Sequence, residues 1–97
     1  MKAVFISFDQ AHFESIMGIL DHNNLRGFTY WESVQGRGSV SGEPHYGSHA
    51  WPGMNSAILT MAEDNQVENL LSLLHDLDNQ TPALGLRAFV MNVEKSI

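Results

Sequence analysis

Short segments with strand character alternate with longer segments of helical period along this chain. In residues 3–8, the positions that would face either side of a strand are mostly apolar, which predicts a central strand covered on both faces. Aromatic and β-branched residues predict a second strand at Phe28–Val34, and further strands are expected at Met54–Met61 and Leu86–Val93. The pattern therefore predicts four strands.

Two segments between these strands have the apolar spacing of amphipathic helices. The first is expected at about Gln10–His22 with Asp9 as its N-cap, and the second begins with Asp64 or Asn65 as its cap. The second helix stops at residues 79–82, where Thr81 and Pro82 break the pattern. The histidines of these helices are expected on helix exteriors or at helix ends, namely His12, His22 and His75.

The resulting order is β-α-β-β-α-β. This order predicts an α+β, ferredoxin-like sandwich, in which a four-stranded antiparallel sheet carries two helices on one face. We expect a single domain over residues 1–97. Because the strands carry apolar side chains on both of their faces, neighbouring subunits are expected to cover the open face of the sheet.

Composition narrows the classes of partner. The chain has 97 residues, a formal net charge of −6 and no cysteine. Such a charge disfavours nucleic acid and anionic membrane surfaces, and the short apolar run at the start of the chain is too short for a signal peptide or a membrane span. We therefore expect a cytoplasmic protein that binds neither nucleic acid nor membrane.

The glycine-rich stretch between the second and third strands, residues 35–53, is predicted to be a long functional loop. It opens with Gly36, Arg37 and Gly38. Glycine N–H groups can approach an anion closely, and a guanidinium adds a fork of donors, so this motif favours a phosphate or carboxylate site. A strand exit that needs glycine dihedrals, with a solvated arginine, explains the same residues.

The same loop carries a second candidate constellation, Glu43, His45 and His49. Imidazole and carboxylate are the ligands that zinc, copper or nickel accept in a protein without cysteine. Exposed loop histidines without a ligand are the alternative interpretation. No arrangement of nucleophile, base and acid is visible in the sequence, so catalysis is not expected.

Several segments in this order resemble the nitrogen-regulatory P-II family. The second strand ends in Val34-Gln35-Gly36-Arg37-Gly38, and the loop contains a tyrosine before glycine at Tyr46-Gly47. The C-terminal end adds further matches, which are Thr81, Phe89-Val90 and Val93-Glu94. The chain looks like a divergent member with a shortened loop, in which Leu84-Gly85-Leu86-Arg87-Ala88 replaces the family's phosphate-binding Gly-Asp-Gly-Lys run.

The resemblance implies a non-enzymatic regulatory homotrimer. In that family adenine nucleotides bind between subunits, and the long loop reaches a target protein such as a transporter or a regulator. Carried onto this chain, the residues expected to contact an anionic effector are Gly36, Arg37, Gly38 and Arg87. The alternative is a transition-metal-responsive module, similar to the divalent-cation-tolerance proteins of the same architecture, with Glu43, His45 and His49 as ligands.

Overall fold

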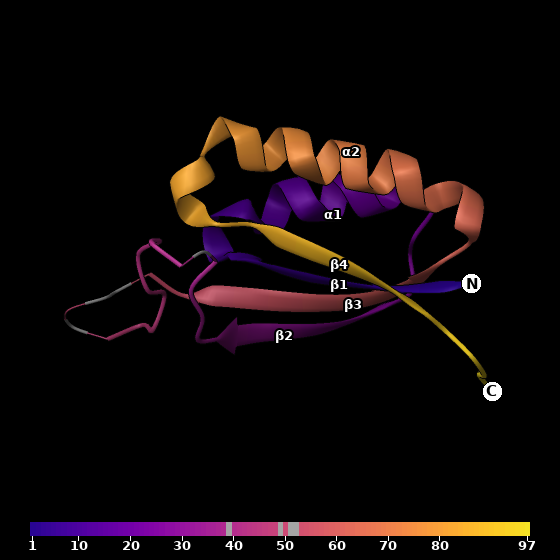
Figure 1. Ribbon diagram of the computed structural model, residues 1–97, viewed down its shortest axis with the longest axis horizontal. Helices are drawn as coiled ribbons and strands as arrows, with labels where there is room; N and C mark the ends of the chain where they lie inside the picture. The colour runs from indigo at the N-terminus through magenta and orange to yellow at the C-terminus, as the bar shows by residue number, and fades with distance from the viewer. Residues whose placement is uncertain (39, 49, 51–52) are drawn as a thin grey trace.

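The computed structural model describes residues 1–38, 40–48, 50 and 53–97. Its strands are β1 (Lys2–Asp9), β2 (Phe28–Val34), β3 (Asn55–Ala62) and β4 (Arg87–Asn92). Its α-helices are α1 (Phe13–His22) and α2 (Asp64–Gln80), and short 3₁₀ turns occupy Gln10–His12 and Pro82–Leu84. The predicted β-α-β-β-α-β order and the α+β, ferredoxin-like class are confirmed (Figure 1).

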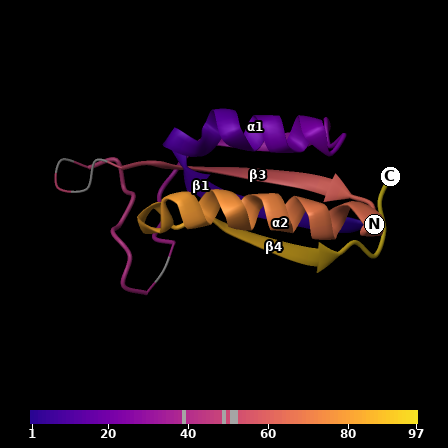
Figure 2. The same cartoon turned by 90° about the horizontal axis from the view of Figure 1, so that it is seen from above.

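The four strands form one antiparallel sheet in the order β2-β3-β1-β4. Strand β1 is central, as predicted from the apolar residues on both of its faces. Its residue Phe5 lies opposite Leu59 of β3 on one side and Phe89 of β4 on the other. Both helices cover the same face of the sheet (Figure 1), with α2 running along the β4 side (Figure 2). The edges of the sheet are therefore β2 and β4.

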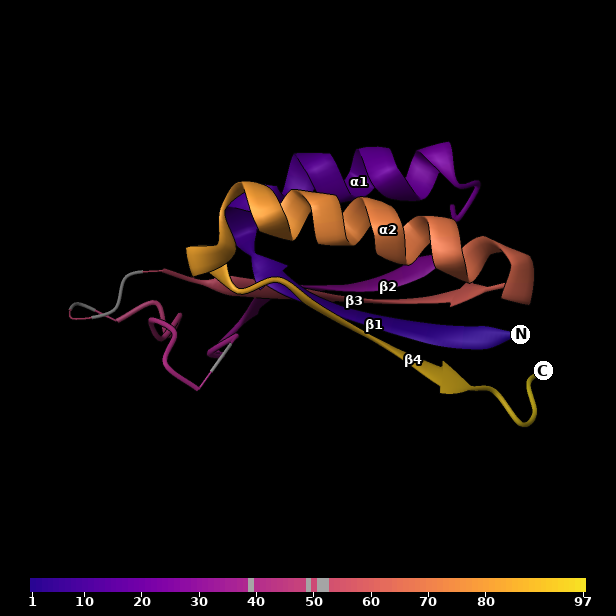
Figure 3. The same ribbon diagram turned by 45° about the horizontal axis from the view of Figure 1, so that its top comes forward.

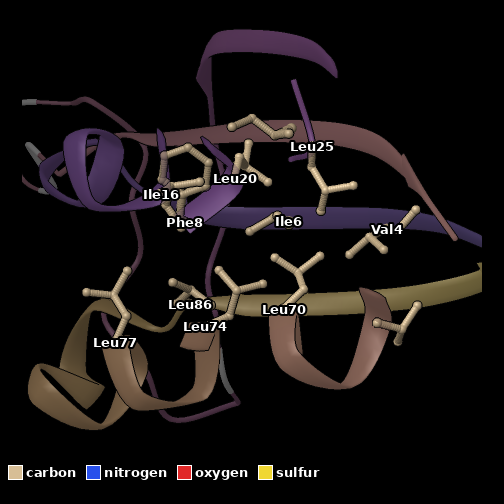
Figure 4. Close-up of a cluster of buried hydrophobic side chains, with 13 residues drawn as sticks. Val4, Ile6, Phe8, Ile16, Leu20, Leu25, Leu70, Leu74, Leu77 and Leu86 are labelled. Carbon is tan, nitrogen blue, oxygen red and sulfur yellow. The ribbon is translucent and has the colours of Figure 1, made fainter. Parts of the chain in front are cut away.

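The core lies between this sheet and the two helices (Figure 4). From β1 it takes the alternate residues Val4, Ile6 and Phe8, all fully buried. The apolar stripes of the helices pack onto them through Ile16, Leu20, Val67, Leu70, Leu74 and Leu77. Burying such side chains contributes roughly 1.5–3 kcal/mol each, so this layer dominates the stability of the fold.

The opposite face of the sheet is apolar and exposed. Phe89 of β4 is 56% exposed and Trp31 of β2 is 44% exposed, and Met61 and Met91 are similarly open. The register places Ala3 between Met61 and Met91, so these side chains form a row across the central and edge strands. A row of large apolar side chains that no helix covers is a surface that favours association.

The helix starts differ in detail from the sequence prediction. Asp9 caps as expected, because its Oδ1 accepts a hydrogen bond from Ala11 N at 2.8 Å, but the first turn is 3₁₀ rather than α-helical. The N-cap of α2 is Glu63, not Asp64 or Asn65, and Gln66 Oε1 accepts from Glu63 N at 2.8 Å. Within the described residues, neither helix has the length and apolarity needed to cross a membrane.

His12 corrects a further expectation. It lies in the 3₁₀ turn before α1 and is only 7% exposed, whereas the sequence predicted an exterior position. Its Nε2 lies 3.3 Å from Thr81 Oγ1, at the C-cap of α2. His22 and His75 are exposed, as predicted. The predicted position of His12 was wrong because the α-helical spacing was applied from Gln10, whereas α1 begins only at Phe13.

Candidate functional site

The base of the loop between β2 and β3 is closed by backbone pairing. Gly36 N donates to His45 O at 3.0 Å, and His45 N donates to Gly36 O at 2.7 Å. A second bridge joins Tyr46 to Met54, and Gly47 N donates to Gly53 O at 2.8 Å. The predicted structureless loop is thus divided into two narrower loops, residues 36–45 and 46–54. Sequence reasoning missed this division because both bridges join glycine-rich segments without strand patterning.

His45 is the side chain that fixes this loop base to the sheet. It is only 4% exposed, and its Nδ1 lies 2.6 Å from Asn55 Oδ1 and 3.6 Å from Asp9 Oδ2. Since Asn55 Oδ1 can only accept, the His45 tautomer that fits carries its hydrogen on Nδ1. Gly53 lies against the ring, where a Cβ would stand 3.2 Å from His45 Cδ2. The expectation of an exposed loop histidine is therefore wrong for His45.

The candidate metal ligands do not gather in the described part of the chain. Glu43 is exposed, His45 is directed toward Asn55 and Asp9, and His49 lies outside the described residues. Among the residues that the structure describes, no group of three His, Cys, Asp or Glu side chains is placed to hold a metal ion. A metal site built on these residues accordingly stays a prediction.

The two halves of the candidate anion site meet at a contact between two glycines. A Cβ on Gly38 would stand 2.1 Å from Gly85 O and 2.6 Å from Gly85 Cα. Gly85 has a φ of +68°, a left-handed conformation that glycine adopts without strain. The contact brings the segment of Gly36, Arg37 and Gly38 against the turn that leads to Arg87. This turn and the loop base lie at the same end of the sheet (Figure 3).

Gly36 takes a different role from the one predicted. Its backbone N–H already donates to His45 O, so that group is not available to an anion while the loop base stays closed. Arg37 is exposed and forms no ion pair with a described residue. The groups that remain at the junction for an anion are therefore Arg37, the Gly38 backbone and Arg87.

Arg87 is held in place at the start of β4. Its Nη1 donates to Leu86 O at 2.6 Å and lies 3.5 Å from Asp78 Oδ2 of α2. The Arg87 side chain is 40% exposed, so part of the guanidinium faces solvent. A partly exposed arginine of this kind can donate hydrogen bonds to an anion.

Asp78 is the residue at this site that sequence reasoning missed. The signal was its spacing: Asp78 follows Leu74 by four residues, so it shares the core-facing side of α2. A carboxylate on the border of an apolar stripe requires a partner, and Arg87 supplies one. Beside this pair, α2 and the start of β4 border an open pocket of about 560 Å³, lined by Leu71, Leu74, His75, Asp78, Leu86, Arg87 and Ala88.

Comparisons with solved structures identify the same fold. The chain resembles CPII, a nitrogen regulatory PII-like protein from Thiomonas intermedia K12 bound to ADP, AMP and bicarbonate, with a TM-score of 0.77 at 21% identity, over 95% of this chain and 84% of that one. The apo form of CPII gives a TM-score of 0.72 at 18% identity, over 95% and 87% of the two chains. A PII-like signaling protein from Thermus thermophilus gives 0.66 at 22% identity, over 95% and 85%.

No protein-family model and no curated protein matches the sequence. At the identities of the structural matches, the comparison establishes the fold. The resemblance to the P-II family, first seen in the glycine and tyrosine motifs of the loop, is thereby confirmed at the level of the fold.

The Gly38–Gly85 contact generates a stability prediction. Gly38→Ala is expected to lower the free energy of unfolding by about 1–3 kcal/mol, because the new Cβ collides with backbone atoms that cannot rotate away. The measurement is urea denaturation followed by circular dichroism.

Gly18→Ala is the matched control. Gly18 lies in α1, and a Cβ added there would meet no atom within 4 Å, so alanine should raise the stability by about 0.5–1 kcal/mol. A Gly38→Ala variant as stable as the parent would show that the two segments separate freely in solution.

Proposed function

We propose that this chain is a P-II-like, non-enzymatic signalling protein whose small anionic effector binds where the loop base meets the α2–β4 turn. The observation that carries the proposal is the Gly38–Gly85 contact, which joins the loop to the turn before Arg87. Two arginines stand at this junction, Arg37 exposed and Arg87 partly exposed. In a chain of net charge −6, the meeting of two segments that each carry an arginine favours this part of the surface for an anion.

Adenine nucleotides are the leading class of effector, and bicarbonate is the second. Both appear in the CPII structure that shares this fold. Arg37 and Arg87 would supply charge to phosphate or bicarbonate oxygens, and the Gly38 backbone would approach them closely. Arg87 stands near the place of the family's phosphate-binding lysine, which supports the nucleotide.

Binding would act on the loop through the same contact. An anion held by Arg37 and the Gly38 backbone would fix the first narrow loop, whose ends are joined at Gly36 and His45. Fixing that segment would select one arrangement of the loop surface offered to a target protein. The target is expected to be a transporter or a regulator, by similarity to the P-II family.

Calorimetric titration with ATP, ADP and AMP tests the effector. At least one of the three nucleotides should bind, and Arg87→Ala should weaken it by about tenfold or more, because a charge-assisted hydrogen bond to phosphate is lost. Arg26→Ala is the control, since Arg26 lies at the other end of the sheet, before β2, and should leave affinity unchanged. The absence of heat with every nucleotide at millimolar concentration would remove the nucleotide from the proposal.

The exposed apolar face supports assembly into a homotrimer with the sheets facing inward. Trp31, Phe89 and Met91 are exposed on the side of the sheet away from the helices. Covering these side chains would recover burial energy that one small domain cannot obtain alone.

Light scattering tests the assembly. The parent protein should have about three times the chain mass of 10.8 kDa, and Phe89→Glu should shift it toward the monomer, because a charge would be buried in the interface. Val40→Glu is the matched control: Val40 is 99% exposed in the loop, and this change should leave the mass unaltered. A parent protein that stays monomeric at micromolar concentration would contradict the trimer.

One observation favours metal binding as a second candidate function. The Nδ1 of His45 is held by Asn55 Oδ1, with Asp9 beyond it, and metal-binding histidines in proteins commonly have their second ring nitrogen fixed in this way. This arrangement fixes the tautomer that keeps a lone pair on Nε2. The remaining ligands would come from Glu43 and His49, or from the loops of neighbouring copies.

Titration with zinc, copper and nickel tests this candidate. The double variant His45→Ala/His49→Ala should abolish binding, and Asn55→Ala should weaken it by about 10–100-fold through loss of the group that orients His45. His75→Ala is the control, since His75 is exposed on α2. Unchanged affinity in the double variant would assign any bound metal to another site.

A further inference from the structure

The pocket between α2 and β4 has a distinctive distribution of polar and apolar groups. Its walls are mostly apolar, formed by Leu71, Leu74, Leu86 and Ala88. Asp78 and Arg87 also line it, and their charged groups are paired, with Arg87 Nη1 3.5 Å from Asp78 Oδ2. At about 560 Å³ it has room for a ligand of nucleotide size. The pocket shares Arg87 with the candidate anion site.

The carboxylate of Asp78 is incompletely satisfied. Its Oδ2 lies 3.5 Å from Arg87 Nη1, but its Oδ1 is buried and has no hydrogen-bond partner among the described residues. Only 19% of the Asp78 side chain is exposed. A buried carboxylate oxygen without a donor is unfavourable, so a bound water or ligand that donates a hydrogen bond to it would stabilise it.

The chemistry of the pocket limits what can bind there. The ligand must donate a hydrogen bond to Asp78 and carry an anionic group for Arg87, and it must also cover the apolar walls. A simple inorganic anion fails, because it would face the negative charge of Asp78 and leave the walls open. Bicarbonate has one hydroxyl but is too small to cover them. A ribonucleotide meets all three requirements through its hydroxyls, its phosphates and its base.

We propose that Asp78 is a nucleotide-binding residue, which accepts hydrogen bonds from the ribose hydroxyls while Arg87 binds the phosphates. This inference rests on the proposed function and adds a residue and a specificity to it. Carboxylates accept hydrogen bonds from ribose diols in other nucleotide-binding proteins. The phosphates draw Arg87 away from Asp78, and the ribose replaces the lost partner, so the carboxylate stays satisfied in the bound state.

The experiment compares ADP with 2′,3′-dideoxy-ADP, which keeps the phosphates and the base but lacks both ribose hydroxyls. The parent protein should bind ADP about tenfold more tightly or better, since hydrogen bonds to a charged acceptor are strong. Asp78→Ala should reduce this preference to roughly one. Asp76→Ala is the matched control, because Asp76 is exposed on the same helix, and the parent preference should be kept.

Two further variants separate the roles of the charged pair. Arg87→Ala should weaken both nucleotides, because it removes the phosphate contact, and it should keep the preference for ADP, because Asp78 remains to accept from the ribose. Asp78→Asn keeps the shape of the side chain and one acceptor oxygen but removes the negative charge, so it replaces Asp78→Ala if that variant unfolds, and it should reduce the preference without abolishing it.

The results distinguish a failure of the role proposed for Asp78 from a failure of the nucleotide site itself. Equal binding of ADP and dideoxy-ADP by the parent, or an unchanged preference in both Asp78 variants, overturns the role of Asp78 and leaves the proposed nucleotide site standing. Binding of neither compound overturns both.

Discussion

The pairing of β1 along both of its edges is the constraint on which this structure depends. Strand β1 is hydrogen-bonded to β3 on one side and β4 on the other, and its buried residues Val4, Ile6 and Phe8 receive both helices. Its last residue, Asp9, then serves two further purposes. One carboxylate oxygen starts the turn before α1, and the other approaches His45 in the loop. Asp9 thereby connects the loop base directly to the central strand of the sheet.

Two of the five basic residues of this acidic chain belong to segments that meet in the fold. Arg37 and Arg87 come from segments far apart in the sequence, and the Gly38–Gly85 contact brings those segments together. Asp78 partly neutralises the positive charge of Arg87 by pairing with it. In the proposed site, this internal counter-ion would weaken anion binding relative to an unpaired arginine, and the other groups of the ligand that donate to Asp78 would decide which anion binds best.

The strands and helices were predictable because their apolar residues follow the periods of the sheet and the helix. The loop base was not, since the pairing of Gly36 with His45 uses backbone groups that any residue possesses. His45 looked like a surface histidine because its partners, Asp9 and Asn55, lie at the ends of two strands and meet only in the fold. Asp78 was overlooked for a similar reason: its partner Arg87 is nine positions along the chain, beyond a turn. Short-range pattern thus predicts the scaffold, whereas the polar contacts of the site depend on tertiary proximity.

The two bridges in the loop have a consequence for how this protein can change. Because Gly36 pairs with His45 and Tyr46 pairs with Met54, each narrow loop is closed at its own base. The entropic cost of closing a loop rises only slowly with its length, so residues can be added within the second loop at little cost. Such insertions would lengthen the surface beyond Gly47 while the first loop keeps its length and its contact with Gly85. The length of the second loop can therefore change without altering the first loop or the proposed effector site, although one connection between β2 and β3 carries both loops.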